Sequence, residues 1–284
     1  MGQDMAVFRG GVAVITGAGS GIGEGLARLA AQQGMRVVLA DVALDRAEQV
    51  AEEVRAGGAE ALAVHTDVAE PEALDRLAAV THETFGDVTL LVNNAGIETL
   101  GYVWELPAAL WEKTLNVNIH GAIHGVRAFA PRMLEAGKRA WIANTSSIGG
   151  LGIMPIQTSY VLSKHAILSF SECLYLEMQV KKAPIHVSAI LPGPVATRIF
   201  EDSKTGEDPV NARHREIMRN MLKSDGITGF EAAERILPQI AEGRFWVSTH
   251  PETTREFANN RARHLSELSA PSLPPEVLAG LGVG

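Results

Sequence analysis

The chain has 284 residues, of which 46% are hydrophobic and 20% charged, an ordinary globular composition that can bury a large core. Its net charge of −8 and its lack of a long Lys/Arg run argue against a nucleic-acid-binding surface. The single cysteine excludes an intramolecular disulfide, and the absence of a signal-peptide pattern and of a transmembrane-length apolar run leads us to expect a cytoplasmic protein without a membrane partner.

Short apolar runs alternate with longer amphipathic stretches along the first two-thirds of the chain. The apolar runs predict strands at residues 11–17, 35–41, 60–68, 88–96, 140–147 and 185–193, and a last strand at 244–250. The stretches between them predict helices at residues 21–34, 44–58, 71–86, 110–134 and 158–180. Cys173 falls in the last of these helices and is expected to be a small core residue. The alternation predicts an α/β fold, a single-domain Rossmann-type doubly wound parallel sheet with helices on both faces.

We expect one domain over residues 1–284, with two segments outside the alternating pattern. Residues 198–226 are polar and charged and predict a substrate-loop insertion over the sheet edge, which is either a lid or a plain solvated helix pair. Residues 251–284 form a C-terminal extension that begins with a predicted helix over 249–268. Its Pro- and Gly-rich end is either loose or an arm that packs on a neighbouring subunit.

The first strand leads directly into a glycine-rich turn, "VITGAGSGIGEG", that opens the first helix. Its glycines are Gly17, Gly19, Gly21 and Gly23, and Ile22 stands at the third position of the general dinucleotide fingerprint. Glycine lets the backbone turn tightly and approach a pyrophosphate, and the helix N-terminus offers free N–H groups. The alternative is a tight turn without a ligand, but its placement between strand and helix favours a nucleotide.

Asp41 ends the second strand, close to where an acidic residue bonds the ribose hydroxyls of adenosine in dinucleotide sites. A carboxylate there repels a 2′-phosphate, the next residue is Val42 rather than arginine, and Ser20 in the glycine loop is not basic. The sequence therefore predicts NAD as the cofactor, with NADP less favoured. The alternative role for Asp41 is a helix N-cap.

Taken together, these and the later motifs resemble the classical short-chain dehydrogenase/reductase (SDR) family over roughly residues 8–250. The resemblance is carried by "TGAGSGIG" (16–23), "NNAG" (93–96), Asn118 in "NVNIHG", the serine pair 146–147, "YVLSK" (160–164) and "PGPVAT" (192–197). It implies an NAD(P)-dependent oxidoreductase that acts on a CH–OH group. It also implies a homodimer or homotetramer built through the long helices at about 103–133 and 158–180.

Four catalytic residues follow from the resemblance. Tyr160 is the implied general acid/base, and Lys164 is implied to depress the pKa of Tyr160 and to hold the nicotinamide ribose. Ser147, thirteen residues before Tyr160, is implied to bond the substrate oxygen in preference to Ser146. Asn118 is implied to hold a water in a proton relay with Lys164. These residue types suit hydride transfer, because negative charge develops on the substrate oxygen and needs a donor.

The resemblance also implies a set of cofactor contacts from six parts of the chain. In these contacts Asp67 and Val68 meet the adenine, and the segment that begins at Pro192 holds the nicotinamide carboxamide. The full set is Gly17, Gly19, Ser20, Gly21, Ile22, Gly23, Asp41, Asp67, Val68, Asn93, Ala95, Gly96, Tyr160, Lys164, Pro192, Gly193, Val195 and Thr197.

Residues next to the catalytic set are expected to bound the substrate pocket. They are Glu98, Ile148, Gly149, Met154, Gln157, Pro194, Ile199 and Phe200, and either Trp104 or the 198–226 segment is expected to close over the pocket. Most are apolar, so we expect a hydrophobic secondary alcohol or ketone as the small-molecule partner, with Glu98 and Gln157 available for a distal polar group.

Other functions have weaker support in the sequence. His120 and His124 have the spacing of a metal pair, but Gly121 stands where a zinc-protease motif needs glutamate, so we expect an ordinary helix face and no metal site. An NADPH-dependent carbonyl reductase of the same family stays open, as does a non-catalytic nucleotide-binding protein on the same scaffold. The presence of both Tyr160 and Lys164 argues against the non-catalytic alternative.

Overall fold

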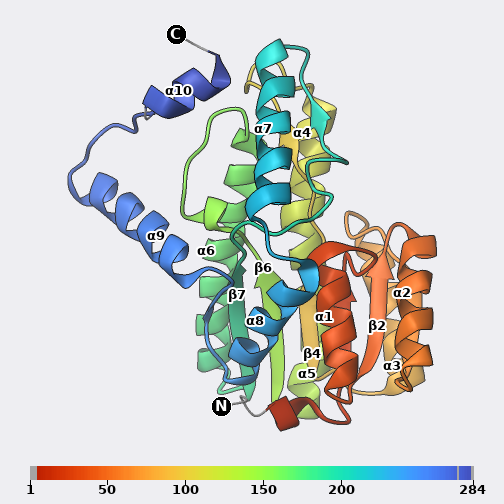
Figure 1. Ribbon diagram of the computed structural model, residues 1–284. Helices are drawn as coiled ribbons and strands as arrows, with labels where there is room; N and C mark the ends of the chain where they lie inside the picture. The colour runs from red at the N-terminus through yellow and green to blue at the C-terminus, as the bar shows by residue number, and fades with distance from the viewer. Residues whose placement is uncertain (1–4, 274, 283–284) are drawn as a thin grey trace.

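A central parallel sheet of seven strands forms the centre of the molecule (Figure 1). The computed structural model describes residues 5–273 and 275–282. The strand order is β3-β2-β1-β4-β6-β7-β9. The strands are β1 (Val12–Thr16), β2 (Arg36–Asp41), β3 (Ala61–His65), β4 (Leu90–Asn93), β6 (Ala140–Thr145), β7 (Ile185–Leu191) and β9 (Trp246–Ser248). A second, two-stranded parallel sheet joins β5 (Thr99–Leu100) to β8 (Lys204–Thr205).

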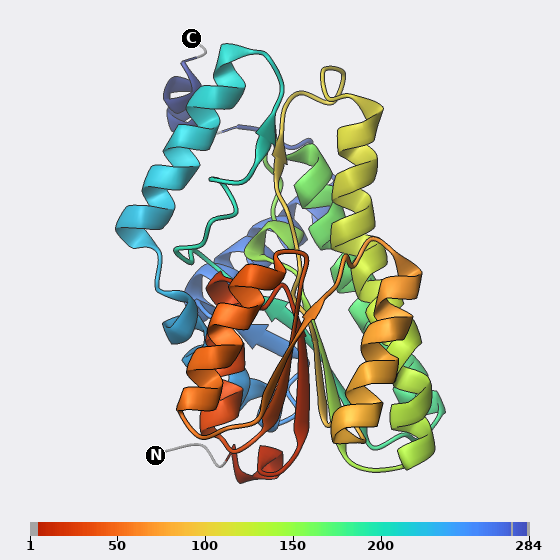
Figure 2. The same ribbon diagram turned by 90° about the vertical axis from the view of Figure 1, so that its right-hand side faces the viewer.

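Helices cover both faces of the large sheet (Figure 2). The α-helices are α1 (Gly21–Gln32), α2 (Leu44–Ala56), α3 (Pro71–Phe85), α4 (Ala108–Leu115), α5 (Gly121–Ala136), α6 (Thr158–Val180), α7 (Pro209–Asp225), α8 (Gly229–Ala241), α9 (Pro251–Ser266) and α10 (Pro275–Leu281). Short 3₁₀ turns lie at η1 (Met5–Phe8) and η3 (Ile148–Gly150), and a π-helical segment, η2 (Asn116–His120), joins α4 to α5. The predicted Rossmann-type α/β fold is confirmed.

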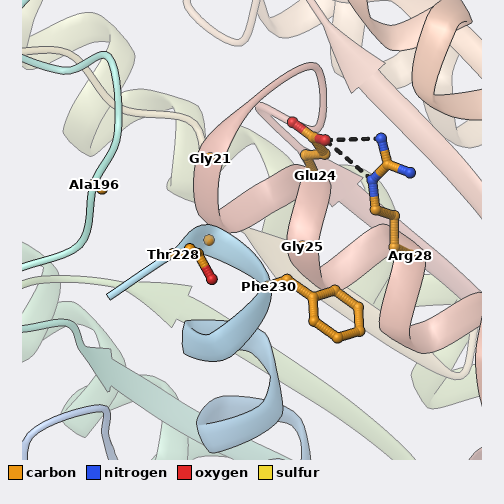
Figure 3. A pocket seen from close by; sticks show the side chains of 8 residues that line it. Gly21, Glu24, Gly25, Arg28, Ala196, Thr228 and Phe230 are labelled. Atoms are coloured by element: carbon orange, nitrogen blue, oxygen red, sulfur yellow. Dashed lines mark hydrogen bonds and ion pairs between the residues drawn. The ribbon is translucent and has the colours of Figure 1, made fainter. Parts of the chain in front are cut away.

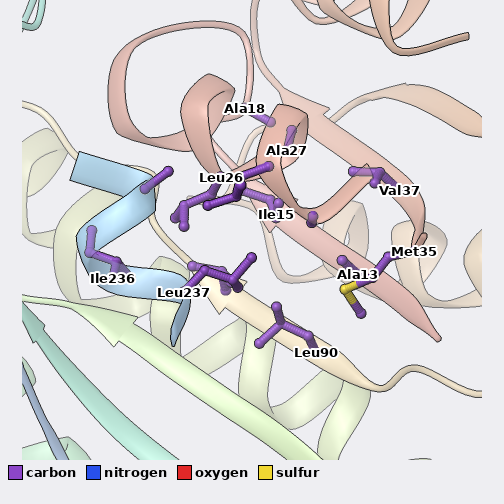
Figure 4. Packing of buried hydrophobic residues seen from close by; sticks show 14 of the residues in the cluster. Ala13, Ile15, Ala18, Leu26, Ala27, Met35, Val37, Leu90, Ile236 and Leu237 are labelled. Atoms are coloured by element: carbon purple, nitrogen blue, oxygen red, sulfur yellow. The ribbon is translucent and has the colours of Figure 1, made fainter. Parts of the chain in front are cut away.

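The two helix layers pack on opposite sides of each strand because successive side chains of a strand alternate in direction. Ile15 of β1 faces the layer of α1, α2 and α8, where it belongs to one core cluster with Leu26 and Ile236 (Figure 4). Val14 faces the layer of α3, α5 and α6, and belongs to a second cluster with Phe129. Both faces are therefore buried, which explains why the strands read as continuous apolar runs.

One helix prediction and the predicted burial of Cys173 need correction, and one helix was not predicted. The long helix does not begin near residue 103 and is not continuous: α4 starts after Pro107, and the π-helical segment interrupts the helical run before α5. Helix α8 was not predicted, although Thr228 and Glu231 form a capping box at its start and its apolar face is buried in the core. Cys173 is exposed, because the buried face of α6 passes through Ser171, Leu174 and Met178 rather than Cys173.

Residues 198–226 and the C-terminal end lie together beside the sheet. Helix α7 occupies most of the polar segment, and α10 packs against it, with Leu281 and Val277 joining Leu222 in a small apolar cluster. The C-terminal helix thus contacts its own chain. In the described ranges, no helix has both the length and the apolar character needed to cross a membrane.

Candidate active site and cofactor site

The glycine-rich turn has backbone angles and close contacts that exclude larger residues. Gly17 and Gly21 have φ angles of +65° and +58°, a region that favours glycine. A Cβ at Gly23 would overlap the carbonyl oxygen of Gly17. The first turn of α1 keeps free N–H groups, because the N-cap Ser20 makes no side-chain cap and the helical bonding starts with Glu24 N to Ser20 O. A tight loop with exposed N–H groups fits a pyrophosphate.

Asp41 lies beside this loop and bonds two backbone groups. Its Oδ2 accepts from the N–H of Gly19 at 2.8 Å, and its Oδ1 accepts from the N–H of Ala43 at 2.9 Å. The carboxylate therefore braces the glycine loop and the start of α2 together. Each oxygen keeps a further lone pair, so a ribose contact is compatible with this bracing.

An arginine also lies near the glycine loop, although it was not anticipated from the sequence. A Cβ at Gly19 would stand 3.0 Å from Cβ of Arg46, and Nη1 of Arg46 lies 4.0 Å from Asp202 Oδ2. The residue directly after Asp41 is Val42, whereas Arg46 follows four residues later. Helix α2 carries Arg46 back toward the loop one turn later.

Tyr160 and Lys164 lie one turn apart near the start of α6. The Nζ of Lys164 is 5.4 Å from the ring centroid of Tyr160 and donates to the carbonyl oxygen of Thr145 at 3.0 Å. Ser147 is hydrogen-bonded to Tyr160, and its Oγ also accepts from the N–H of Gly149 at 3.0 Å. The end of β6 and the start of α6 thus bring the predicted serine, tyrosine and lysine together.

The two neighbouring serines have different partners. Ser146 is buried and donates to the carbonyl oxygen of Lys164 at 2.7 Å, so its hydroxyl joins β6 to α6. Ser147 lies on the same side as Tyr160, since a Cβ at Gly149 would contact both side chains. Ser147 is therefore the serine that faces Tyr160, and its catalytic role stays a prediction.

Asn118 lies in the π-helical segment, where its buried side chain makes three hydrogen bonds. Its Oδ1 accepts from Ile97 N at 2.8 Å, and its Nδ2 donates to Ile97 O at 2.9 Å and to Ser163 Oγ at 3.0 Å. Both amide hydrogens are used. The side chain therefore fixes the chain beside Gly96, where a Cβ would stand 3.3 Å from Lys164 Nζ.

Burial governs the ionisation of the pair in the protein without cofactor. Burial raises the pKa of Tyr160, the charge of Glu98 adds to this, and the hydrogen bond from Ser147 opposes it. Burial lowers the pKa of Lys164 to about 8, against a raising effect of Glu98. The predicted depression of the Tyr160 pKa is therefore wrong for this state, because the burial of the phenol is the largest effect on its pKa and raises it.

The segment after β7 returns across the glycine loop. A Cβ at Gly21 would lie 3.0 Å from Cγ2 of Thr197, so the two loops are in close approach. The N–H of Gly193 donates to Oγ1 of Thr249 at 2.9 Å, and that hydroxyl is 2.8 Å from Nδ1 of His250. Thr249 was missed because it lies far along the chain and shows no motif of its own.

Replacing Thr249 by Val should weaken cofactor affinity about tenfold, because it leaves the Gly193 N–H without its acceptor in a buried place, a loss of about 1–3 kcal/mol. Titration with NAD, followed by calorimetry, measures the effect. Thr249→Ser keeps the hydroxyl and should bind NAD like the parent protein. Equal affinities for the Val and Ser variants would contradict the assigned contact.

The remaining predicted cofactor residues lie along the same edge with different side-chain roles. Asp67 makes a local turn by accepting from the N–H of Ala69 at 2.9 Å, and Val68 packs under Gly121. Asn93 points inward, where it donates to Asn144 Oδ1 at 2.8 Å beneath α5. Its side chain therefore braces the sheet, which leaves only its backbone for the predicted cofactor contact. The N–H of Ala95 bonds Thr16 Oγ1 at 3.1 Å, which ties β4 to β1.

The predicted pocket residues differ in burial and in their contacts, so they do not all line one surface. Glu98 and Gln157 bond each other and are both buried, so neither is free for a distal group of the substrate. Phe200 is buried in the cluster under α7, while Ile199 packs partly buried against it. Trp104 is 80% exposed and stacks on Tyr102. Ile148, Gly149, Met154 and Pro194 are partly buried, and a Cβ at Gly149 would contact both Ser147 and Tyr160.

A separate hollow lies between the starts of α1 and α8 (Figure 3). Its lining includes Gly21, Gly25, Thr228 and Phe230, and the ion pair between Glu24 and Arg28 lies at its side. Its lining includes none of the predicted catalytic residues. Across the described part of the chain no cluster of three or more His, Cys, Asp or Glu suits a metal ion.

Comparison with known proteins places this geometry in a family. Residues 11–208 match the model of the short chain dehydrogenase family, and the chain belongs to that family. The 1-deoxy-11-beta-hydroxypentalenate dehydrogenase of Streptomyces avermitilis is 31% identical over 274 residues, covering 92% of this chain and 96% of the relative. The cyclohexanol dehydrogenase of an Acinetobacter species is 38% identical over 204 residues, covering 70% of this chain and 79% of the relative.

A solved structure supports the same assignment over nearly the whole chain. A short-chain dehydrogenase/reductase from Burkholderia phymatum, in complex with NAD, superposes with a TM-score of 0.90 at 34% identity. The match covers 96% of this chain and 99% of the other. The protein is thus an oxidoreductase of this family. Solved relatives carry NAD or NADP, so family membership by itself leaves the choice of cofactor open.

Proposed function

We propose that the protein transfers a hydride between NAD and a hydrophobic secondary alcohol or ketone, with Tyr160 as general acid/base. The observation that carries this proposal is the convergence of Ser147, Tyr160 and Lys164 at the sheet edge that also bears the glycine loop. The nicotinamide, when bound, accepts or supplies the hydride. The residues of this chain then handle the proton and the developing charge.

Each catalytic residue has a task that its position supports. In alcohol oxidation, Tyr160 takes the hydroxyl proton, and Ser147 donates a hydrogen bond to the substrate oxygen. The ammonium of Lys164 stabilises the phenolate across the 5.4 Å that separate it from the ring centroid. Asn118 holds Gly96 and Ile97 against Lys164, and we propose that it also positions the water of a proton relay.

The substrate class rests on two lines of support. Ile148 directly follows Ser147, and the partly buried Met154 stands between Ser147 and Tyr160 in the chain. One relative is named for cyclohexanol and another for a hydroxypentalenate, which are both alcohols. We therefore propose a cyclic or otherwise bulky hydrophobic alcohol or its ketone as the substrate class. A panel of such alcohols and ketones, offered with NAD(H) and NADP(H), tests it, and turnover of short polar alcohols alone would count against it.

Asp41→Ala should lower the preference for NAD over NADP at least about tenfold, since the carboxylate repels a 2′-phosphate. The ratio of kcat/KM values for the two cofactors measures this. Asp41→Asn removes the charge but keeps an acceptor for one backbone N–H, and should shift the ratio in the same direction. Asp45→Ala, on the exposed side of α2, is the matched control. Tight NADPH binding by the parent protein would overturn the proposal.

An NADPH-dependent carbonyl reductase is the second candidate. Arg46 favours it, because its Cβ lies near Gly19 and a guanidinium is a common partner of a 2′-phosphate. Arg46 is paired with Asp202 at 4.0 Å, so a phosphate would have to compete with that carboxylate. A third candidate, a non-catalytic nucleotide-binding protein, would gain support if NAD bound but no alcohol or ketone reacted.

We also propose that the protein works in the cytoplasm as a homodimer or homotetramer. The exposed Leu176 and Val180 of α6 would be covered in such an assembly. Analytical ultracentrifugation tests it, and a monomer at micromolar concentration would count against it.

A further inference from the structure

A buried carboxyl group lies next to the catalytic helix and is not explained by the proposed chemistry. Glu98 is 3% exposed and Gln157 is 6% exposed. The Nε2 of Gln157 donates to Glu98 Oε2 at 3.1 Å, and the N–H of Thr99 donates to Oε1 at 3.2 Å. Both partners are neutral, and in the described part of the chain no ion pair includes Glu98. A carboxyl group is costly to bury with only neutral donors, so its presence calls for a role.

Glu98 belongs to a set of contacts that fixes the start of α6. Gln157 is the N-cap of that helix and holds Glu98, while Ser159 Oγ donates to Thr99 O at 3.2 Å. The N–H of Gly101 donates to Ile156 O at 2.8 Å. Ile156 has a φ of +69°, a left-handed conformation that is strained for a β-branched residue. Tyr160 follows in the first turn, so its position depends on this clamp.

Glu98 also lies in a segment that meets the catalytic pair: it is two residues from Gly96, where a Cβ would stand 3.3 Å from Lys164 Nζ, and its partner Gln157 is three residues before Tyr160. Its ionised carboxylate raises the pKa of Tyr160 and of Lys164. Burial in turn raises the pKa of Glu98 well above its usual range, against a lowering effect of Lys164. The three groups therefore titrate as a coupled set.

We propose that Glu98 is a positioning residue of this dehydrogenase site: its carboxyl group fixes the start of α6 through Gln157 and places a negative charge beside Tyr160 and Lys164. This inference rests on the proposed function of Tyr160. Removal of the negative charge of Glu98 should lower the pKa of both Tyr160 and Lys164. Both groups should then lose their protons at lower pH.

The pH profile of kcat/KM for alcohol oxidation tests the proposal. In Glu98→Gln, both limbs of the profile, measured at saturating NAD, should move to lower pH by about one unit, because both neighbouring groups lose a charge that raises their pKa. Gln157→Met keeps the carboxyl group of Glu98 but removes its hydrogen-bond donor, which favours the neutral form of that carboxyl group. Both limbs should therefore move to lower pH, but by less than in Glu98→Gln. Glu105→Gln is the matched control, since Glu105 also accepts from an amide, Asn211 Nδ2, without acting on Tyr160.

Superimposable profiles for the parent protein and Glu98→Gln would overturn the proposal. A uniform loss of activity with unmoved limbs would do so too, because it would mark a merely structural residue. Circular dichroism and Tm show whether Glu98→Gln folds. If it does not, the milder Gln157→Met decides in its place, and unmoved limbs in that variant overturn the proposal.

A second readout separates this inference from the proposed function. The chain has three tyrosines, so the phenolate absorbance of the folded protein minus that of Tyr160→Phe reports Tyr160 alone. The same difference in the Glu98→Gln background should start at lower pH. If it does and no alcohol is oxidised, the proposed function fails and the role of Glu98 stands. If alcohols are oxidised and the difference is unmoved, the role of Glu98 fails and the proposed function stands.

Discussion

Tyr160→Phe should lower kcat/KM for alcohol oxidation about 10³-fold while NAD affinity stays within about twofold, since a positioned acid/base contributes about 10²–10⁴-fold. The substitution removes only the phenol oxygen. Ser147 would lose a hydrogen-bond partner but keep its bond from the Gly149 N–H, so the substrate side of the site should hold its shape.

Steady-state kinetics and an NAD titration measure the two halves of this prediction. Tyr175→Phe is the matched control, because Tyr175 lies on the same helix but packs against Phe245 away from Ser147. A Tyr160→Phe variant with more than a tenth of the parent activity would show that the proton is handled elsewhere. A large loss of NAD affinity would instead assign Tyr160 to cofactor binding.

Lys164→Met should lower kcat/KM about 10²–10³-fold and also weaken NAD binding, because the ammonium has two proposed tasks. It stabilises the Tyr160 phenolate, and it holds the nicotinamide ribose. Lys164 is buried and donates to Thr145 O, so the variant also leaves that carbonyl without its donor. Lys164→Arg should not restore activity, since Nζ lies in close approach to Gly96 and leaves little space for a guanidinium.

Kinetics at several pH values, together with an NAD titration, test this second prediction. Lys138→Met is the control, because Lys138 is exposed and pairs with Asp87 far from α6 in a surface ion pair, which is worth about 0–1 kcal/mol. Retention of parent activity by Lys164→Met would contradict the account. Loss of activity with unchanged NAD affinity would remove the ribose from the tasks of Lys164.

The parts of the fold that could be predicted are those with a local signature. Strands such as β1 are buried on both faces, so their apolar runs are visible in the sequence. The glycine turn before α1 is equally visible, because positive φ at Gly17 and close approach at Gly23 need glycine. Tyr160 and Lys164 were recognised from the resemblance to the family, which "YVLSK" helps to carry, and α6 places them together.

Contacts between distant parts of the chain could not be predicted in the same way. Thr249 reaches Gly193, and Gln157 reaches Glu98, across 56 and 59 residues without any pattern that links them. Arg46 comes near Gly19 only because α2 folds back along β2. The raised pKa of Tyr160 also depends on tertiary burial, which a spacing argument does not contain. These distant contacts affect the hydrogen bonding and the pKa values of the site, whereas the local motifs determine where in the fold the site lies.

The central claim is that this site oxidises a hydrophobic secondary alcohol with NAD. The most direct test is the initial rate of reduced-nicotinamide formation with cyclohexanol and related alcohols, measured with NAD and with NADP for the parent protein and Tyr160→Phe. We expect turnover with NAD, slower turnover with NADP, and almost none in the Tyr160→Phe variant. No turnover of any alcohol by a parent protein that binds NAD, or equal rates in the variant, would contradict the account.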